Sequence, residues 1–372
     1  MKKVTGLMAN LGIGGAEVQS VILFNGLCKN GYKVKLIVLE DNRKNLADRL
    51  DKSIEVAYVN RRHYIDPLSV LEVKRLICEE MPDYLIMVDN YPVLYGILLK
   101  KLFKLKLNNF AILHNTIPPN LKREIQNRFV YGPSLNRLGR VVFVCSRQKD
   151  YWVDRYGINP GKSAVVLNGI DIEHFNQFSN SNDKYKCREK LGIPSDITVL
   201  AINASLWPAK SHEHMIEAMY MLKKEGLELF LLIIGDGPRR KYLERLVSDK
   251  GLTDRVLITG YVRDIRPYLM CADISVLTST ATETLSMAAL ESMALGKALI
   301  LSNIGGAPEI VDDGVNGYLY SPGNVLELAV AIKRMAEGRI YRIMGEKALL
   351  KVSSLFTQEK MISGYIQLLE SG

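Results

Sequence analysis

The sequence predicts an α/β protein with two doubly wound domains, each built on a parallel sheet that helices cover on both faces. Near-continuous apolar segments rich in Val, Ile and Leu alternate with helix-like segments along most of the chain. Such strands are typical of parallel sheets buried on both faces. A polar stretch at residues 176–186 interrupts this alternation once. The length of 372 residues leaves room for two or three domains of ordinary size.

The first half of the chain contains seven predicted strands. They lie at residues 2–11, 32–40, 54–60, 84–89, 109–115, 141–146 and 163–169. Helical patterns separate several of these strands, most clearly at residues 16–31 and 67–81. We therefore expect a first domain over residues 1–175.

After the polar stretch, which is typical of an interdomain linker, the alternation starts again. Five further strands are predicted at residues 197–205, 227–237, 255–262, 274–279 and 297–303. They define a second domain over residues 187–354. Ligands of such sheets bind at the carboxyl ends of the strands, so we expect the site in a cleft between the domains.

Composition describes a soluble globular protein, with 48% hydrophobic and 24% charged residues. The apolar run at the N-terminus is broken early by Asn10 and by glycines, so it predicts a strand and neither a signal peptide nor a membrane span. The five cysteines are widely separated, and none has the spacing of a metal ligand set. We expect reduced thiols, a cytoplasmic protein and no metal.

Positive charge is concentrated in the first half of the chain. Residues 1–170 hold 26 Lys and Arg against 15 acids, and residues 171–372 hold 23 against 25. Residues 100–149 contain eleven basic residues and one acid, Glu124, interleaved with Leu and Phe. This segment predicts docking on anionic lipid headgroups or a grip on an acidic acceptor, and a solvated basic face is the simpler alternative. No recognisable nucleic-acid module accompanies the charge, so no nucleic-acid partner is predicted.

The most informative segment runs from Glu283 to Glu291, between a buried strand and a helix over residues 286–295 that Gly296 ends. The first backbone N–H groups of this helix, at Leu285, Ser286 and Met287, suit an anion such as a diphosphate. Glu291 lies further along the helix and suits the vicinal diol of a ribose, which leaves Glu283 beside a sugar. Acids also begin helices for capping alone. The apolar company of Glu291 favours a bound partner instead.

Three other candidate elements follow predicted strands. The glycine turn at residues 11–17 resembles a dinucleotide fingerprint, but Glu17 stands where the third glycine would be and argues against a dehydrogenase. We interpret the turn instead as an approach loop for an anion or acceptor. His114 ends a buried strand, where a structural role is the simpler reading and a place in the cleft the functional one. Lys210 follows the first strand of the second domain and suits a phosphate, although a solvated loop lysine is equally compatible.

Together these elements resemble the retaining glycosyltransferases of family 4, which have the GT-B fold. The resemblance covers nearly the whole chain and rests on the order of its motifs. These are G-G-A-E from Gly14, N-G-I-D from Asn168, G-D-G-P from Gly235, G-Y-V from Gly260, the Glu283 and Glu291 pair, and G-G-A-P-E-I-V-D-D-G-V-N-G from Gly305. It implies two Rossmann-like domains, with the acceptor largely in the first and the donor in the second. It also implies that a last helix, within residues 355–372, crosses back onto the first domain.

The resemblance also implies a role for each site residue. Glu291 would bind the donor ribose and Glu283 the hydroxyls of the transferred sugar. The amides of residues 285–287 and Lys210 would hold the diphosphate, the backbone at Val262 and Arg263 would meet the base, and Gly15 and His114 would lie near the diphosphate and the reacting sugar. No cofactor is implied, since the nucleotide sugar is a substrate and the helix and lysine could replace a metal.

The sequence departs from the family pattern at four positions. Ala204 and Ser205 stand where the family usually has a glycine and an arginine ahead of its lysine, and Thr284 and Ser286 replace glycines usual after the first glutamate. Arg239, Arg240 and Lys241 are candidate substitutes for that cation, although a solvated helix face is their simpler role.

The resulting prediction is a hexosyl-type transferase that uses a nucleoside-diphosphate sugar, a UDP-sugar by preference. Its acceptor would be a glycan or a lipid-linked molecule in the synthesis of a surface polysaccharide, lipopolysaccharide or glycolipid. We expect it in the cytoplasm, peripheral at the inner face of the membrane. The alternatives on the same fold are a nucleotide-sugar epimerase, a phosphorylase, and a catalytically silent partner subunit.

Overall fold

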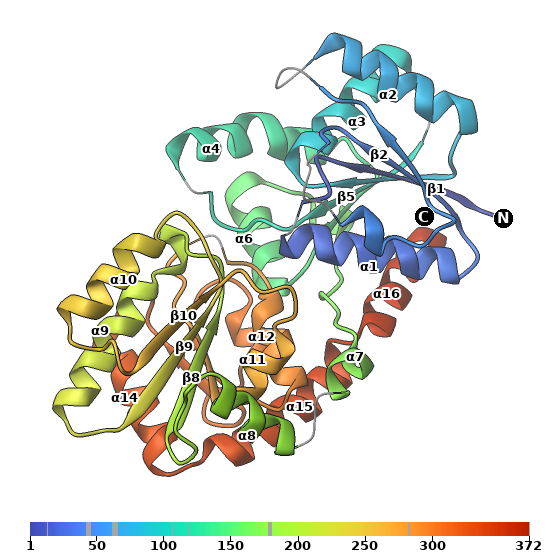
Figure 1. Cartoon of the computed structure of the whole chain (residues 1–372). Coiled ribbons are helices and arrows are strands. Elements are labelled where there is room, and N and C mark those ends of the chain that lie inside the picture. The colour runs from blue at the N-terminus through green and yellow to red at the C-terminus, as the bar shows by residue number, and fades with distance from the viewer. Residues whose placement is uncertain are drawn as a thin grey trace. The chain divides into compact units, whose positions relative to one another are not determined.

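A computed structural model describes residues 1–12, 14–41, 46–61, 66–105, 107–118, 120–177, 181–281 and 283–371 of the chain. The chain divides into two compact units (Figure 1). Unit 1 comprises Met1–Gly169 together with Gln358–Gly372, and unit 2 comprises Ile170–Thr357.

Unit 1 contains a seven-stranded sheet in the order β3-β2-β1-β4-β5-β6-β7. Every pairing between these strands is parallel. The strands are β1 (Lys3–Met8), β2 (Lys33–Val38), β3 (Glu55–Tyr58), β4 (Tyr84–Val88), β5 (Asn108–Leu113), β6 (Arg140–Phe143) and β7 (Ser163–Val165). All seven coincide with predicted strands, and the parallel sheet is confirmed.

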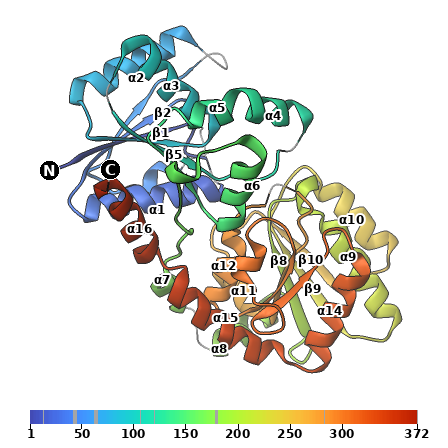
Figure 2. The same ribbon diagram turned by 180° about the vertical axis from the view of Figure 1, so that it is seen from behind.

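Helices cover both faces of this sheet (Figures 1 and 2). They are α1 (Gly15–Lys29), α2 (Pro67–Glu80), α3 (Asn90–Phe103), α4 (Leu121–Gln126), α5 (Gly132–Leu135), α6 (Ser146–Tyr156) and α16 (Gln358–Glu370), and a π-helical turn, η2 (Asn127–Tyr131), joins α4 to α5. One face packs on α2, α3 and α6 through a buried cluster that includes Val73, Tyr95 and Trp152. The last helix, α16, packs on α1 so closely that a Cβ on Gly26 would collide with Ile362. The expectation that the C-terminal helix joins the first Rossmann-like body is confirmed.

Local sequence sets where the helices of unit 1 begin. At α2 the side chain of Asp66 accepts a hydrogen bond of 3.1 Å from the Leu68 amide, and Pro67 occupies the first helical position. In the part of the chain that the structure describes, no helix is both long and apolar enough to cross a membrane.

Unit 2 contains a six-stranded parallel sheet in the order β10-β9-β8-β11-β12-β13. The strands are β8 (Thr198–Asn203), β9 (Leu229–Ile234), β10 (Val256–Gly260), β11 (Ile274–Leu277), β12 (Ala298–Ser302) and β13 (Gly317–Tyr320). Five of them were predicted. The sixth, β13, was missed because four residues that begin with glycine give no apolar run, and its pairing with β12 makes it a strand.

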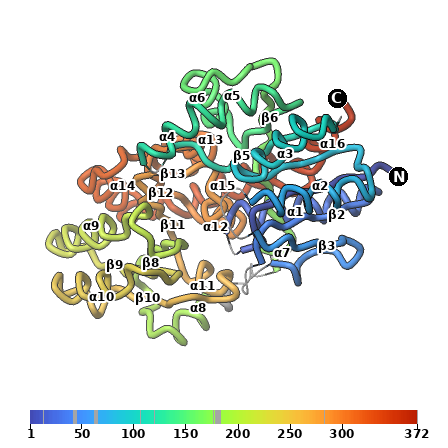
Figure 3. The backbone as a smooth tube through the Cα atoms, turned by 90° about the horizontal axis from the view of Figure 1, so that it is seen from above, coloured from blue at the N-terminus to red at the C-terminus, as the bar shows by residue number. Residues whose placement is uncertain are grey.

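Two layers of helices enclose this second sheet (Figure 3). On one face α9 (His212–Lys224), α10 (Arg240–Asp249) and α14 (Val325–Glu337) bury a cluster that includes Ile216, Leu243 and Ile332. The other face packs on α8 (Ser181–Lys190) and α11 (Arg266–Cys271). The remaining helices are α7 (Ile172–Asn176), α12 (Met287–Ala294), α13 (Ala307–Ile310) and α15 (Tyr341–Leu355).

The polar stretch predicted as a linker becomes helical at Ser181, where α8 begins. Its residues 178–180 lie outside the described residues. The buried Arg188 of α8 donates to Asp273 at 2.8 Å and Lys184 donates to the same carboxylate at 2.5 Å, so two ion pairs fix this polar helix to the core. Tertiary ion pairs of this kind leave no apolar period in the sequence, which is why the helix was not predicted.

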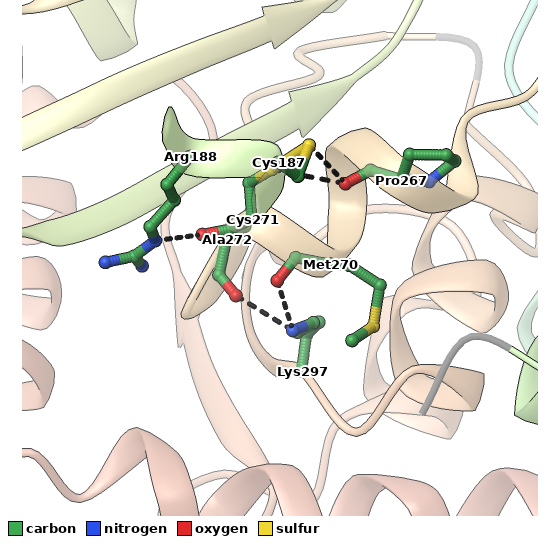
Figure 4. The surroundings of a disulfide bond; sticks show 7 residues. All are labelled: Cys187, Arg188, Pro267, Met270, Cys271, Ala272 and Lys297. Carbon is green, nitrogen blue, oxygen red and sulfur yellow. Dashed lines mark hydrogen bonds between the residues drawn. A yellow bond between two sulfur atoms is a disulfide. The ribbon is translucent and has the colours of Figure 1, made fainter. Parts of the chain in front are cut away.

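A disulfide joins α8 to α11 between Cys187 and Cys271, whose Cα atoms are 6.1 Å apart (Figure 4). Both sulfurs face the carbonyl oxygen of Pro267, at 3.1 and 3.2 Å. The expectation of five reduced thiols is therefore wrong for these two residues, while Cys28, Cys78 and Cys145 are not disulfide-bonded. A separation of 84 residues between the partners gives no local signal in the sequence.

Candidate functional site

Three of the predicted site residues of unit 2, Lys210, Glu283 and Glu291, lie near the point where its strand order reverses. From β8 the chain runs outward to β9 and β10, and β11 then pairs with the opposite edge of β8. The loops that follow β8 and β11 therefore diverge at the carboxyl ends of two neighbouring strands. In doubly wound sheets this topological switch point is where ligands bind.

Lys210 and Glu283 meet at this point. The Lys210 ammonium, at the end of the loop after β8, donates a hydrogen bond of 2.6 Å to a carboxylate oxygen of Glu283, in the loop after β11. The hydroxyl of Ser279 donates to the same oxygen at 2.8 Å. The side chains of Lys210 and Glu283 are 26% and 15% exposed, so the pair lies half-buried with one side open to solvent.

The two loops are joined along their length. The Thr278 hydroxyl donates to the Lys210 carbonyl at 2.7 Å, and the Thr280 amide donates to the Ala209 carbonyl at 3.0 Å. Ser211 shares a hydroxyl hydrogen bond of 2.8 Å with Thr280 and has a φ of +46°, a strained value for a residue other than glycine. This network fixes the backbone on both sides of Lys210.

A glycine pair holds the turn that carries Glu283. Gly305 has a φ of +51°, and a Cβ there would collide with the Glu283 carbonyl oxygen. The next amide, at Gly306, donates to the Thr284 carbonyl at 2.6 Å. The motif that begins at Gly305 thus needs glycine for close backbone approach.

Helix α12 begins directly behind this turn. Ser286 is its N-cap, and its hydroxyl accepts from the Ala289 amide at 3.4 Å. Thr284, Leu285 and Ser286 are all less than 9% exposed, so their side chains point into the protein and their backbone forms the turn. Thr284 and Ser286 replace the glycines of the family pattern with side chains turned to the interior. Gly296, with a φ of +66°, follows the helix as predicted.

Glu291 lies in the second turn of α12 and reaches back to β8. One of its carboxylate oxygens accepts a hydrogen bond of 2.8 Å from the side-chain amide of Asn203, the last residue of β8. Asn203 was not predicted as a site residue, although a polar residue at the end of an apolar strand could have indicated one. Ser279 gives a weaker signal, because serine is common in loops.

Ser205, Val262 and Arg263 are further predicted site residues of unit 2. Ser205 is exposed in the loop after β8. Val262 and Arg263 follow β10, the edge strand two positions from β8, with Val262 packed against the core and Arg263 exposed. The structure does not place these three residues in the hydrogen-bond network around Glu283.

Two of the three candidate substitutes for the missing arginine have acidic partners. Arg239 donates to Glu213 at 2.7 Å. Arg240 pairs with Asp236 at 3.3 Å and with Glu244 at 2.8 Å, while Lys241 is exposed on α10. Among the described residues, Lys210 places a cation at the switch point through its hydrogen bond to Glu283.

Unit 1 has its own switch point, between β1 and β4, and Gly15 and His114 lie at its carboxyl end. Gly15 is the first residue of α1, after β1, and His114 follows β5. Asp89, after β4, accepts from the His114 amide at 2.9 Å and has a φ of +64°. Strained residues of this kind cluster at functional sites, and Asp89 was missed although it is an acid that ends an apolar strand.

Two titratable groups of unit 1 are perturbed at this end of the sheet. Burial lowers the pKa of the His114 imidazole, against an opposing effect of Asp89. Burial raises the pKa of the Glu17 carboxyl, and the charge of Asp89 acts in the same direction. Burial therefore favours the neutral form of the His114 imidazole. The Glu17 carboxylate lies against Gly14 at the start of α1.

No group of three or more His, Cys, Asp or Glu side chains among the described residues is placed to hold a metal ion.

Two family models match the chain in sequence. The model of glycosyltransferase family 4 matches residues 13–174, and that of the group 1 glycosyl transferases matches residues 183–349. The chain belongs to the group 1 glycosyltransferases. The first match contains Gly15 and His114, and the second contains Lys210, Glu283 and Glu291.

Relatives and solved structures agree with this family. The chain is 27% identical over 227 residues to the UDP-Gal:alpha-D-GlcNAc-diphosphoundecaprenol alpha-1,3-galactosyltransferase of Escherichia coli, a match that covers 60% of this chain and only 58% of that enzyme. It is 24% identical over 369 residues to an uncharacterised glycosyltransferase of Haemophilus influenzae, with 97% and 98% of the two chains covered. The crystal structure of HepE from Anabaena in complex with UDP has a TM-score of 0.87 at 22% identity over all of both chains. The predicted GT-B fold of this family is confirmed.

Proposed function

We propose that this protein is a retaining glycosyltransferase that moves a sugar from a UDP-sugar to a glycan or lipid-linked acceptor. The observation that carries this proposal is the arrangement of Lys210, Glu283 and Glu291 around the start of α12. Two of the similar crystal structures contain UDP and UDP-glucose, and the name of the Escherichia coli relative specifies a diphosphoundecaprenol acceptor.

The donor would lie along α12. Its diphosphate would meet the backbone at residues 285–287 and the Lys210 ammonium, its ribose would bind Glu291, and its base would meet Val262 and Arg263. Glu283 would accept hydrogen bonds from hydroxyls of the transferred sugar. For Gly15 and His114 we propose contacts with the diphosphate and with the reacting sugar.

Lys210 would stabilise the charge that develops as the donor breaks down. The bond between the anomeric carbon and the β-phosphate oxygen breaks, and the acceptor hydroxyl oxygen bonds to the same face of that carbon. The acceptor proton passes to the departing phosphate oxygen, so no protein base is needed. The ammonium and the helix dipole both act on the charge of the leaving diphosphate.

The cellular location that fits this chemistry is the cytoplasmic face of a membrane. A nucleoside diphosphate is multiply charged and does not enter a bilayer, whereas a lipid-linked acceptor stays in one. The product would then be a surface polysaccharide, lipopolysaccharide or glycolipid intermediate.

A donor panel tests the proposal. Purified protein is incubated with UDP-, GDP- and ADP-sugars and with lipid-linked or glycan acceptors, and released nucleoside diphosphate is measured. We expect the protein to release UDP from a UDP-sugar, and we expect an acceptor to increase the rate of this release. By NMR, the anomeric configuration of the product should match that of the donor. A product formed without acceptor would indicate an epimerase, inversion would refute the retaining mechanism, and no release from any donor would indicate a silent partner.

A further inference from the structure

The segment from α4 into η2 in unit 1 exposes an unusual amount of apolar surface. Leu121 is 74% exposed, Ile125 50%, Phe129 70% and Val130 43%. We call these four side chains the apolar ridge. Single exposed apolar residues are ordinary on a soluble protein, but four within ten residues concentrate apolar surface on one short segment, which is typical of a binding surface.

The helix is held so that the ridge must face outward. Leu121, Ile125 and Phe129 recur every four residues, which places them on one side of the segment. The opposite side is buried, with Asn127 3% and Tyr131 1% exposed. The ridge is therefore a fixed feature of the folded unit.

Charge around the ridge has one sign. Lys122 and Arg128 are exposed within the same segment. The acid of this segment, Glu124, accepts hydrogen bonds from Arg155 at 2.7 Å and from the Tyr156 hydroxyl at 2.6 Å. Residues 100–149 contain no second acid. The ridge thus presents apolar side chains flanked by cations whose charge no neighbouring carboxylate of the segment balances.

The exposed apolar side chains of α14 have acidic as well as basic neighbours. On α14 in unit 2, Leu326 and Val330 are 65% and 66% exposed, but Glu327 lies between them and Lys333 is paired with Glu225 at 2.7 Å. Apolar exposure combined with unbalanced positive charge therefore distinguishes the ridge from the exposed apolar side chains of α14.

We propose that the apolar ridge inserts into the interfacial layer of a bilayer that contains anionic lipid, with Lys122 and Arg128 at the level of the headgroups. Apolar side chains flanked by basic ones are the pattern of helices that lie in a membrane surface, and the charge selects an anionic one. The segment starts seven residues after His114, so insertion holds this strand end at the membrane. The link between membrane insertion and catalysis rests on the proposed function, in which the acceptor is lipid-linked.

Vesicle flotation of the full chain tests the surface directly. Vesicles of phosphatidylcholine with an equal amount of phosphatidylglycerol are compared with vesicles of phosphatidylcholine alone. We expect binding to the anionic vesicles, and at least a tenfold weaker partition for the triple variant Leu121→Ser, Ile125→Ser, Phe129→Ser. The matched control, Leu326→Ser with Val330→Ser, removes exposed apolar side chains from unit 2 and should bind like wild type. Equal losses in both variants, or none in the triple variant, would overturn the proposal.

Charge and insertion are separated by two further variants. Lys122→Gln with Arg128→Gln should remove most of the preference for anionic vesicles. Phe129→Trp should show a blue-shifted emission on binding, whereas Leu326→Trp should not. No shift at position 129 would overturn insertion even if the triple variant failed to fold. If wild type does not float with vesicles but forms dimers, and the triple variant is monomeric, the ridge binds a second copy of the chain. That result would overturn the membrane proposal.

Catalysis gives an independent readout. The triple variant should release UDP with a water-soluble acceptor analogue as fast as wild type, and at least tenfold more slowly with an acceptor embedded in vesicles. Equal rates with the embedded acceptor would overturn the role of the ridge in acceptor access. Flotation with no transfer from any donor would refute the proposed function alone.

Discussion

Lys210 and Glu283 form a hydrogen-bonded ion pair of 2.6 Å across the carboxyl ends of β8 and β11. The two strands are neighbours at a topological switch point, so the pair lies where doubly wound sheets generally bind ligands. A diphosphate would compete with the carboxylate for the ammonium. Glu283 would then keep the Ser279 hydroxyl and gain the hydroxyls of a sugar.

Replacing Lys210 tests whether this ammonium carries the essential side-chain charge on the diphosphate. We expect Lys210→Ala to lower kcat about 100-fold or more, since one preorganised donor to a developing negative charge is worth on the order of 10² to 10³ in rate. Lys210→Arg should recover part of the loss. Steady-state kinetics with the UDP-sugar found in the donor panel measure both. Lys241→Ala, at an exposed position on α10, is the control. Near-wild-type values for Lys210→Ala would remove Lys210 from the mechanism.

Asn203 is predicted to position Glu291 for the ribose. Because its side chain donates to one oxygen of Glu291, Asn203→Ala should free the carboxylate to rotate and raise the KM for donor about fivefold, the effect of about 1 kcal/mol for one hydrogen bond. The kcat should change little, since the ribose is remote from the bond that breaks. Glu291→Gln should also reduce discrimination against a donor whose ribose lacks one hydroxyl.

A double-mutant cycle separates positioning from general damage. If Asn203 acts through Glu291, the effects of Asn203→Ala and Glu291→Gln on KM should be less than additive. Additive effects, or a fall in kcat as large as the rise in KM, would contradict the positioning role.

Much of this structure could be predicted because the signals are local. The apolar run at residues 229–234 is recognisable as a strand from its sequence alone. The spacing from Glu283 to Glu291 places one acid in a turn and the other in α12. The links between distant residues could not be predicted. Asn203 and Glu291 are 88 positions apart, and the polar helix α8 is held by an ion pair between Arg188 and Asp273 that is equally remote in sequence. Such contacts depend on strand order, which no local period encodes.

The disulfide between Cys187 and Cys271 predicts a definite thiol count. In guanidinium without reductant, three thiols should react with Ellman's reagent, and five after reduction. The bond closes a long loop, so reduction should lower the free energy of unfolding by up to about 4 kcal/mol. The Tm of Cys187→Ser should be lower than that of oxidised wild type and should not depend on reductant. Cys78→Ser, at an exposed cysteine, should behave like wild type. Disulfides are rare in reducing compartments. Five reactive thiols in protein purified without reductant would show that the bond does not form.

Lys297 predicts that stability rises with pH above neutrality. Its ammonium lies in the core of unit 2, 7% exposed, and donates to the Ala272 and Met270 carbonyls at 2.8 and 3.2 Å (Figure 4). Burial lowers the pKa of Lys297 to about 7, and the charge of Lys184 acts in the same direction. Between pH 7 and the ordinary lysine value, the unfolded chain binds a proton that the folded protein does not.

The free energy of unfolding should therefore increase with pH from 7 to 9.5, by up to about 1.4 kcal/mol per pH unit from this one group. Below pH 7 both states are protonated and the contribution is flat. Urea unfolding at pH 6, 7, 8 and 9.5, followed by circular dichroism, measures the slope, and Lys297→Met should remove the part due to Lys297. Lys241→Met, at an exposed lysine, should keep the wild-type slope. Because other groups titrate in the same range, the decisive quantity is the difference between the two variants. Identical slopes would show that Lys297 is charged in the folded protein throughout this range.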